Sequence, residues 1–149
     1  MMKELVVVLG ILLVLVLPVC GTNTNSPAYI KDVVATKEGD GFQIYFVLAD
    51  SNGQPTSSDG VLYWYITDSH NNLVSPVQFL TTEIRSTEFQ NAKLGVGSFE
   101  HESLIYNIGR IPNSKLAGKL ASETTGKVYV VLRLLPSGKE LKGDTTIIF

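Results

Sequence analysis

Short segments in which apolar and other side chains alternate limit the fold of this chain more than any other feature of its sequence. Residues 42–49 place four large apolar side chains on every second position: Phe42, Ile44, Phe46 and Leu48. Because successive side chains of a β-strand point to opposite faces, this spacing predicts a strand with these four residues in the core. Residues 61–67 and 127–135 show the same alternation.

Turn-forming residues separate these segments at short intervals. Residues 50–55 have the sequence DSNGQP, in which Asp and Asn accept hydrogen bonds from backbone amides and Gly permits a positive φ. The charged residues within 81–89 suit an edge strand. Residues 112–122 are expected to hold either a helical turn capped by Asn113 or Ser114 or an irregular crossover. About six to eight strands are expected, over residues 30–37, 42–49, 61–67, 73–80, 81–89, 97–108, 127–135 and the segment after a turn at 136–139.

These strands do not alternate with long helical patterns, and no internal repeat of fixed period is present. A parallel α/β sheet is therefore disfavoured, whereas closely spaced strands with turn-rich connections are typical of a sandwich or barrel. We predict an all-β domain over residues 29–149, built as an antiparallel sandwich of two sheets. A chain of 149 residues has room for one such domain.

The N-terminal segment has the composition of a secretory signal. Lys3 precedes an apolar run over residues 5–17 that only Gly10 interrupts, and Pro18 ends the run. This order of charge, apolar stretch and break is typical of a cleavable leader, predicted here over residues 1–19. The run is shorter than the roughly 20 apolar residues that a membrane-spanning helix needs. An uncleaved leader that anchors the chain is the alternative.

Residues 17–21, Leu-Pro-Val-Cys-Gly, resemble a lipobox, in which the cysteine behind the apolar run is acylated and becomes the new N-terminus. The resemblance implies that Cys20 carries a lipid and holds the protein at the outer face of a membrane. Val19 departs from the pattern, which prefers Gly, Ala or Ser at that position. The alternative is an ordinary signal peptide cut after Gly21, which leaves a secreted domain. Residues 20–28 form a polar tether in either case.

Residues 47–56, followed by Gly60-Val61-Leu62, resemble the strand, D-x-N-G-x-P turn and strand of bacterial immunoglobulin-like repeats in invasin-type surface proteins. Residues 132–139 are similar to the closing hairpin of those repeats. The resemblance implies a prokaryotic surface lipoprotein with an immunoglobulin-like β-sandwich of the invasin or fibronectin type. It places Trp64 at the position of the core tryptophan of immunoglobulin folds, without the paired cysteines of those folds, because the chain has one cysteine.

The sequence carries none of the commonest catalytic or metal-binding motifs, such as G-x-S-x-G, H-E-x-x-H, a Walker loop or C-x-x-C. We therefore expect no enzymatic activity, no metal and no cofactor.

With 12 basic and 14 acidic residues, the chain lacks the basic excess of a nucleic-acid-binding protein. His70 and His101 are expected to be solvated surface residues. Four residues near strand ends are expected to cap turns, with calcium ligation at one pole as the alternative: Asp50, Asn52, Asp59 and Asp68.

The candidate binding surface consists of Tyr63, Tyr65, Tyr129 and Arg133. In their segments these side chains point away from the predicted core, and they lie together if the two strands are neighbours in one sheet. Tyrosine and arginine are enriched among the residues that contribute most to protein interfaces. The alternatives are that the tyrosines only stabilise a half-exposed sheet as cross-strand pairs, or that residues 73–80 cover them.

These features predict an exported, non-catalytic domain at the cell surface or the outer face of a membrane, which binds an envelope protein or a glycan or supports envelope structure. The membrane is its expected partner, through a lipid on Cys20 or an uncleaved leader, and nucleic acid is not. One alternative is a small secreted enzyme or enzyme inhibitor that uses loops at one pole of the sandwich. Another is an accessory subunit that pairs an exposed strand, residues 81–89 or 144–149, with a partner.

Overall fold

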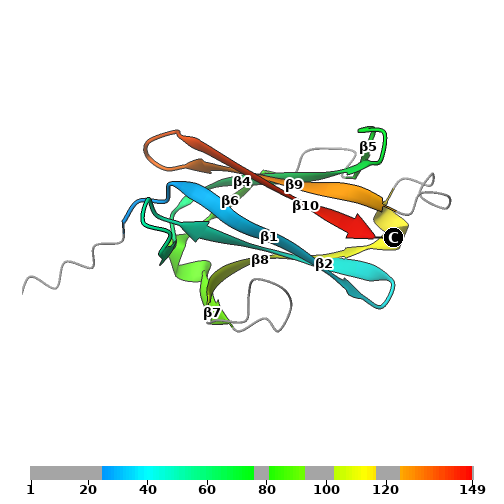
Figure 1. Ribbon diagram of the computed structural model, residues 1–149, viewed down its shortest axis with the longest axis horizontal. Helices are drawn as coiled ribbons and strands as arrows, with labels where there is room; N and C mark the ends of the chain where they lie inside the picture. Colours follow the sequence, from blue (N-terminus) through cyan, green and yellow to red (C-terminus); the bar gives the residue numbers. More distant parts are fainter. Residues whose placement is uncertain (1–24, 76–80, 93–102, 117–124, 149) are drawn as a thin grey trace, which may run out of the picture.

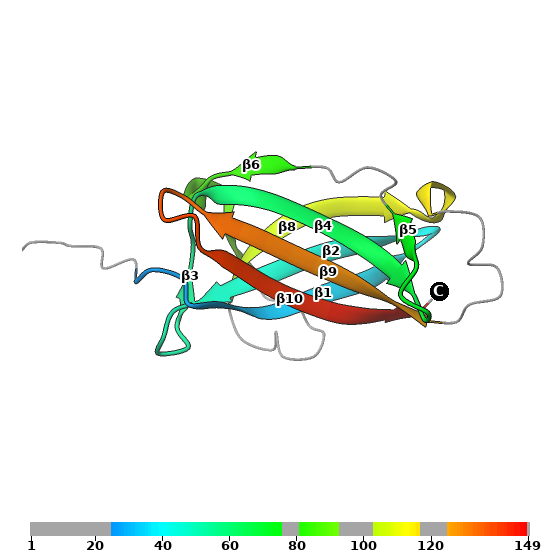
Figure 2. The same cartoon turned by 90° about the horizontal axis from the view of Figure 1, so that it is seen from above.

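Two antiparallel β-sheets packed face to face make up the part of the protein that the structure describes (Figures 1 and 2). The computed structural model describes residues 25–75, 81–92, 103–116 and 125–148. Every strand pairing among them is antiparallel. The prediction of an all-β sandwich of two sheets is therefore confirmed. The described residues include no helix that is long and apolar enough to cross a membrane.

The first sheet has the strand order β1-β2-β8-β7, and a short β3 pairs with the end of β2. Its strands are β1 (Tyr29–Glu38), β2 (Gly41–Ala49), β3 (Pro55–Thr56), β7 (Gln90–Ala92) and β8 (Ser103–Pro112). The second sheet has the order β10-β9-β4-β5, and β6 pairs with the start of β4 while β5 pairs with its end. Its strands are β4 (Gly60–Asp68), β5 (Leu73–Ser75), β6 (Thr82–Ile84), β9 (Thr125–Leu134) and β10 (Glu140–Ile148).

The core lies between the two sheets and is formed by the side chains that the alternation placed there. The four apolar residues of β2 are at most 2 % exposed: Phe42, Ile44, Phe46 and Leu48. From the opposite sheet, Val128, Val130 and Leu132 of β9 are fully buried. Trp64, expected at a core position, is only half-buried and packs against this cluster from its margin.

The outward side of β2 is also partly covered. Val47 is 1 % exposed and forms a small second cluster with Ile105 of β8. Val34 of β1 and Tyr45 pack against this pair. The side chain of Val47 is therefore buried although it points away from the main core.

The two sheets approach each other closely along one side, where β1 and β10 run side by side (Figures 1 and 2). Gly143 of β10 makes this approach possible. A Cβ atom at this position would lie 2.8 Å from Cγ2 of Ile30 and 3.0 Å from Cγ2 of Val33, both on β1. A side chain larger than hydrogen would therefore push the two strands apart.

The structure differs from the predicted elements in two short segments. The expected edge strand over 81–89 is divided into β6 and a 3-10 turn, η1 (Ser86–Glu88). A carboxylate oxygen of Glu88 accepts a 2.6 Å hydrogen bond from the Arg85 amide, which favours the turn over strand pairing. In the second segment, a 3-10 turn, η3 (Asn113–Lys115), follows Pro112 and agrees with the expected helical turn, but no side chain caps it, so the predicted cap by Asn113 or Ser114 is wrong.

Two predicted strands, the predicted leader and Cys20 are among the features that lie partly or wholly outside the described residues. Of the strand expected over 73–80, β5 covers the first three residues. Of the strand expected over 97–108, the described part begins with β8 at Ser103. The leader over residues 1–19 and Cys20 precede the first described residue, Asn25.

Candidate functional site

The predicted surface residues lie together on the outer side of the β4–β9–β10 sheet. Strands β4 and β9 are direct neighbours, and their register places Tyr65 opposite Tyr129 and Arg133 opposite Val61. Tyr63 lies between these two pairs, opposite Val131. The rings of Tyr65 and Tyr129 stack with centroids 4.8 Å apart and an angle of 16° between their planes. We call Tyr63, Tyr65, Tyr129 and Arg133 the tyrosine face.

The tyrosine face combines half-buried rings with charged side chains at its margin. All three tyrosines are half-buried and Arg133 is exposed, whereas Val131, which lies among them, is 4 % exposed. Burial, and to a smaller extent Tyr129, Tyr63 and Asp144, raises the pKa of Tyr65. Its hydroxyl therefore keeps its proton at neutral pH and is able to donate a hydrogen bond.

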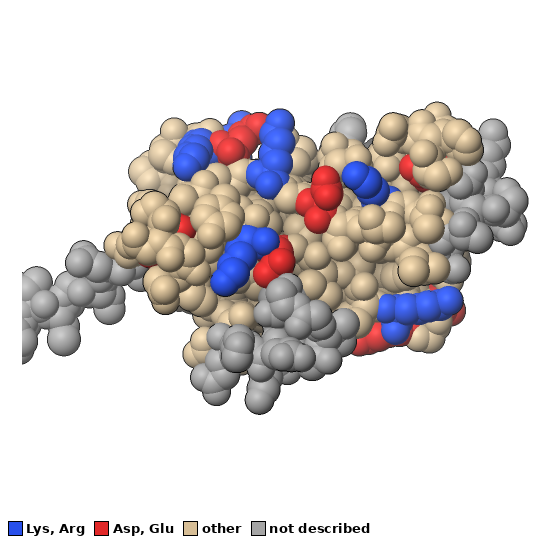
Figure 3. All heavy atoms as spheres, in the orientation of Figure 1, with Lys and Arg blue, Asp and Glu red and all other residues tan. Residues whose placement is uncertain are grey.

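Strand β10 adds alternating charges beside the tyrosine face. Its residues Glu140, Lys142 and Asp144 lie opposite Arg133, Val131 and Tyr129, respectively. Nζ of Lys142 is 3.9 Å from a carboxylate oxygen of Glu140. Figure 3, which shows the side where β1 and β10 meet, likewise has acidic and basic side chains interspersed rather than gathered by sign. The visible surface thus has no broad basic area.

Strand β5 does not cover the tyrosine face. It pairs in the plane of the sheet with the end of β4, where Leu73 lies opposite Thr67. The remaining residues that were expected to cover the tyrosines, 76–80, are outside the described part of the chain.

A second candidate site lies at the end of the sandwich where the described chain begins (left in Figures 1 and 2). Nδ2 of Asn25 donates a 2.6 Å hydrogen bond to the Asp50 carboxylate, and its carbonyl accepts one of 2.7 Å from the Thr56 hydroxyl. The Ala28 amide then donates to the Ala49 carbonyl at 2.8 Å. These contacts fix the first described residues against the turn between β2 and β3.

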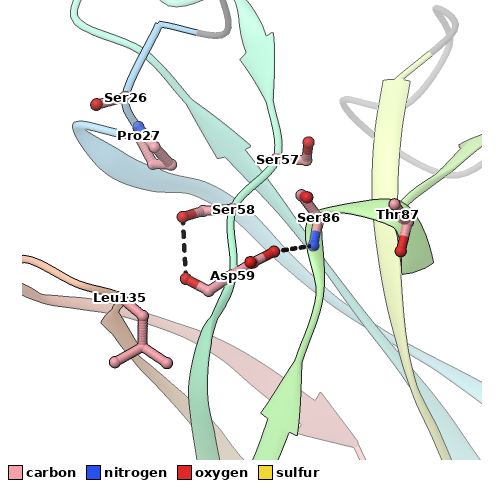
Figure 4. A pocket seen from close by; sticks show the side chains of 8 residues that line it. All are labelled: Ser26, Pro27, Ser57, Ser58, Asp59, Ser86, Thr87 and Leu135. Carbon is pink, nitrogen blue, oxygen red and sulfur yellow. Dashed lines mark hydrogen bonds between the residues drawn. The ribbon is translucent and has the colours of Figure 1, made fainter.

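A hollow of about 470 Å³ opens at this end, and we call it the tether-side hollow (Figure 4). Four separate segments form its wall: the start of the described chain, the link between β3 and β4, η1, and the β9–β10 hairpin. Hydroxyl groups dominate the lining: Ser26, Ser57, Ser58, Ser86 and Thr87. The other lining residues are Asp59, Pro27 and Leu135.

Asp59 holds three of these segments together. Its carboxylate accepts a 2.7 Å hydrogen bond from the Ser86 amide, as Figure 4 shows. Its carbonyl oxygen accepts hydrogen bonds from the Leu135 amide at 3.1 Å and from the Ser58 hydroxyl at 3.0 Å. The bonds from the amide and the hydroxyl of Ser86, followed by the nearby charge of Arg85, lower the pKa of Asp59. The carboxylate is therefore ionised at neutral pH and serves to position the wall.

A second, smaller hollow of about 340 Å³ adjoins the first, because Ser57 lines both. Asp50 contributes to its wall. One carboxylate oxygen of Asp50 accepts hydrogen bonds from the amides of Asn52 at 2.8 Å and Gln54 at 2.9 Å. The side-chain bond from Asn25, ahead of these backbone bonds, lowers the pKa of Asp50. Asp50 thus fastens both its own turn and the incoming chain.

The acidic residues considered for calcium do not gather at one pole. Asp59 precedes β4 and Asp68 ends it, so they lie at opposite ends of a nine-residue strand. Asp68 caps its own turn by accepting 2.8 Å hydrogen bonds from the amides of His70 and Asn72. Among the residues that the structure describes, no group of three or more His, Cys, Asp or Glu side chains is placed to hold a metal ion. His70 is exposed in this turn, and His101 is not among the described residues.

Sequence reasoning missed the tether-side hollow because its wall comes from segments far apart in the chain. Asp59 and Ser86 are 27 residues apart. The available signals were two short hydroxyl-rich runs, at residues 56–58 and 86–87. Comparisons of the chain with protein families, curated proteins and solved structures found no match.

Proposed function

We propose that this chain is an exported, non-catalytic binding domain, held at the outer face of a membrane through Cys20, which contacts an envelope protein or a glycan through the tyrosine face. The observation that supports this function is the adjacency of three tyrosines and an arginine on one side of a sheet. Their positions on neighbouring strands make them a continuous surface rather than separate exposed residues.

The tyrosine face has the properties of a contact surface. Tyrosine offers a large apolar ring with a hydroxyl at its end, and it loses little conformational entropy on binding. Strands β4 and β9 pair along nine residue positions, from Gly60 to Asp68, so the side chains stand on a rigid support. The alternating charges of β10 beside the face suit the polar rim of an interface.

We further propose that the sandwich is immunoglobulin-like. In an immunoglobulin fold, strands A, B, E and D form one sheet, and strands C, F and G form the other. When the short strands β3, β5 and β6 are left out and the other seven are lettered along the chain, β1-β2-β8-β7 becomes A-B-E-D and β10-β9-β4 becomes G-F-C, which agrees with this arrangement. The agreement supports the resemblance to invasin-type repeats that residues 47–56 indicate.

Two experiments test this function. Intact-mass measurement of the natively produced protein is expected to find a diacylglyceryl group on Cys20, whereas an N-terminus at Thr22 contradicts the lipid anchor.

For the tyrosine face, the double substitution Tyr63→Ser and Tyr65→Ser is expected to abolish retention of envelope proteins or glycans on the immobilised full-length chain. Tyr29→Ser is the matched control, because Tyr29 is 43 % exposed on β1, in the other sheet. Unchanged retention by a folded double variant contradicts the role of the tyrosine face.

A further inference from the structure

The geometry points to the tether-side hollow as a second binding site, which accepts an uncharged sugar unit. The site is separate from the tyrosine face, and the inference does not depend on what that face binds. The chemistry of the lining, the rigidity of the wall and the size of the hollow support it.

The lining suits a ligand that is rich in hydroxyl groups. Five serine and threonine residues line the hollow. The hydroxyls of Ser58 and Ser86 bond to Asp59, and a hydroxyl is able both to donate and to accept hydrogen bonds. A sugar presents the same kind of group around its ring. Among the described residues, no Lys, Arg or His side chain lines the hollow, so an anionic ligand would meet no direct counter-charge there.

The single charged group in the lining is already engaged. The Asp59 carboxylate accepts bonds from the amide and the hydroxyl of Ser86. A neutral ligand leaves this arrangement intact, whereas a cationic ligand would compete for the same oxygens. The structure therefore favours an uncharged ligand over a charged one.

The hollow also offers a small apolar area beside its hydroxyls. Leu135 is 45 % exposed at one side, and Pro27 lies at the wall. Sugar rings have C–H groups on their faces and hydroxyls at their edges, so a mixed lining matches them better than a wholly polar one. The volume of about 470 Å³ lies within the range of roughly 300–1,000 Å³ that is usual for small-ligand sites.

The wall of the hollow is held in place before any ligand arrives. Asp59 joins the β3–β4 link to η1 and to the β9–β10 hairpin. Phe89, which follows η1, is 7 % exposed and packs edge-on against Phe46 of the core, with ring centroids 5.8 Å apart. The Nζ of Lys139 in the hairpin donates a 3.2 Å hydrogen bond to the Ala28 carbonyl. Preorganised walls reduce the entropy lost on binding.

Titration of the ¹⁵N-labelled full-length chain with neutral trisaccharides of glucose, mannose, galactose and N-acetylglucosamine tests the site. With at least one of them, we expect saturable amide shifts at Ser57, Ser86 and Thr87 but not at Tyr63 and Tyr65. The absence of a saturable effect at the hollow with all four sugars, presented both in solution and on vesicles, overturns the proposal. Shifts at the tyrosines alone also overturn it, without contradicting the proposed function of the tyrosine face.

Substitutions sharpen the test. Ser57→Ala and Thr87→Val each remove one hydroxyl and are expected to weaken binding about fivefold, the effect of one neutral hydrogen bond. Thr82→Val is the matched control, since Thr82 is exposed on β6 outside the hollow. Unchanged binding by both folded variants, Ser57→Ala and Thr87→Val, would refute the role of the lining hydroxyls.

The source of the sugar is distinguished by presenting it in two forms. One arm uses the soluble trisaccharide, and the other uses the same sugar as the headgroup of a glycolipid in phosphatidylcholine vesicles. Binding in the first arm identifies a free glycan as the ligand, and binding confined to the vesicles identifies a membrane glycolipid. Failure in both arms overturns the site.

Discussion

Replacing Thr67 by Val should stabilise the protein, although it removes a polar group. The hydroxyl of Thr67 is buried and has no hydrogen-bond partner among the described residues, and the residue is 6 % exposed. A buried polar group without a partner costs about 1–3 kcal/mol. Val has nearly the same shape and places a methyl group where the hydroxyl was. We expect the free energy of unfolding to rise by about 1 kcal/mol, equivalent to about 3–5 °C in Tm for a domain of this size.

Thr56 provides a matched control for this substitution. It is 5 % exposed, about as buried as Thr67, but its hydroxyl donates a 2.7 Å hydrogen bond to the Asn25 carbonyl. Thr56→Val loses that bond and leaves the carbonyl without this donor. We expect it to lower the free energy of unfolding by about 1–2 kcal/mol. The same chemical change should therefore have opposite signs at two equally buried positions.

Urea denaturation followed by the fluorescence of Trp64, the only tryptophan, measures both effects. The slope of the transition should be unchanged, so that the shift in midpoint reports stability alone. A Thr67→Val variant that is less stable than the original protein would refute the reasoning, because it would mean that the hydroxyl has a stabilising partner. Destabilisation of both variants by similar amounts would lead to the same conclusion.

Three further predictions concern pH and packing. Hydrogen bonds lower the pKa of Asp50, so its contribution to stability is complete above the unfolded pKa of about 4 and is lost as pH falls through the lower folded pKa. Asp50→Asn should flatten this acid-induced loss of stability in urea titrations. An unchanged pH dependence in the variant would contradict the prediction. Burial raises the pKa of Tyr65, so its contribution to stability is complete below about pH 10 and declines as pH rises through the higher folded pKa. Tyr65→Phe should reduce the loss of stability at alkaline pH, which tyrosinate absorbance and unfolding experiments follow together. An equal loss of stability in the variant would count against the prediction. Gly143→Ala should destabilise the protein by about 1–3 kcal/mol through contact with Ile30 and Val33, and a neutral effect would show that β1 and β10 separate easily.

The strands with strong alternation were predictable because their pattern is a local consequence of having one buried face. The alternating residues of β2 and β9 have the burial that their positions indicate, and the turn at Asp50 forms with the side-chain bonds expected of Asp. The neighbouring positions of Tyr65 and Tyr129 required one more condition, that β4 and β9 pair, which the sequence left open.

Features that depend on contacts between distant segments were not predictable in this way. Val47 is buried in a cluster with Ile105, which lies on a different strand. The η1 turn forms where Glu88 and Asp59 accept hydrogen bonds from successive amides, those of Arg85 and Ser86. Local alternation carries no information about which loops meet at one end of a sandwich. The tether-side hollow is therefore a property of the assembled fold.

The fixed position of Asn25 determines how an anchored molecule would stand on its membrane. Cys20 precedes Asn25 by five residues, which reach about 18 Å at full extension. With a lipid on Cys20, this short connection would keep the end of the sandwich that holds Asn25 near the lipid headgroups. The end of β10, at Ile148, would then point away from the membrane (Figure 1). A fluorescent protein fused after residue 149 would then project away from the bilayer, while reagents too large to enter a narrow gap would be kept from the anchored pole.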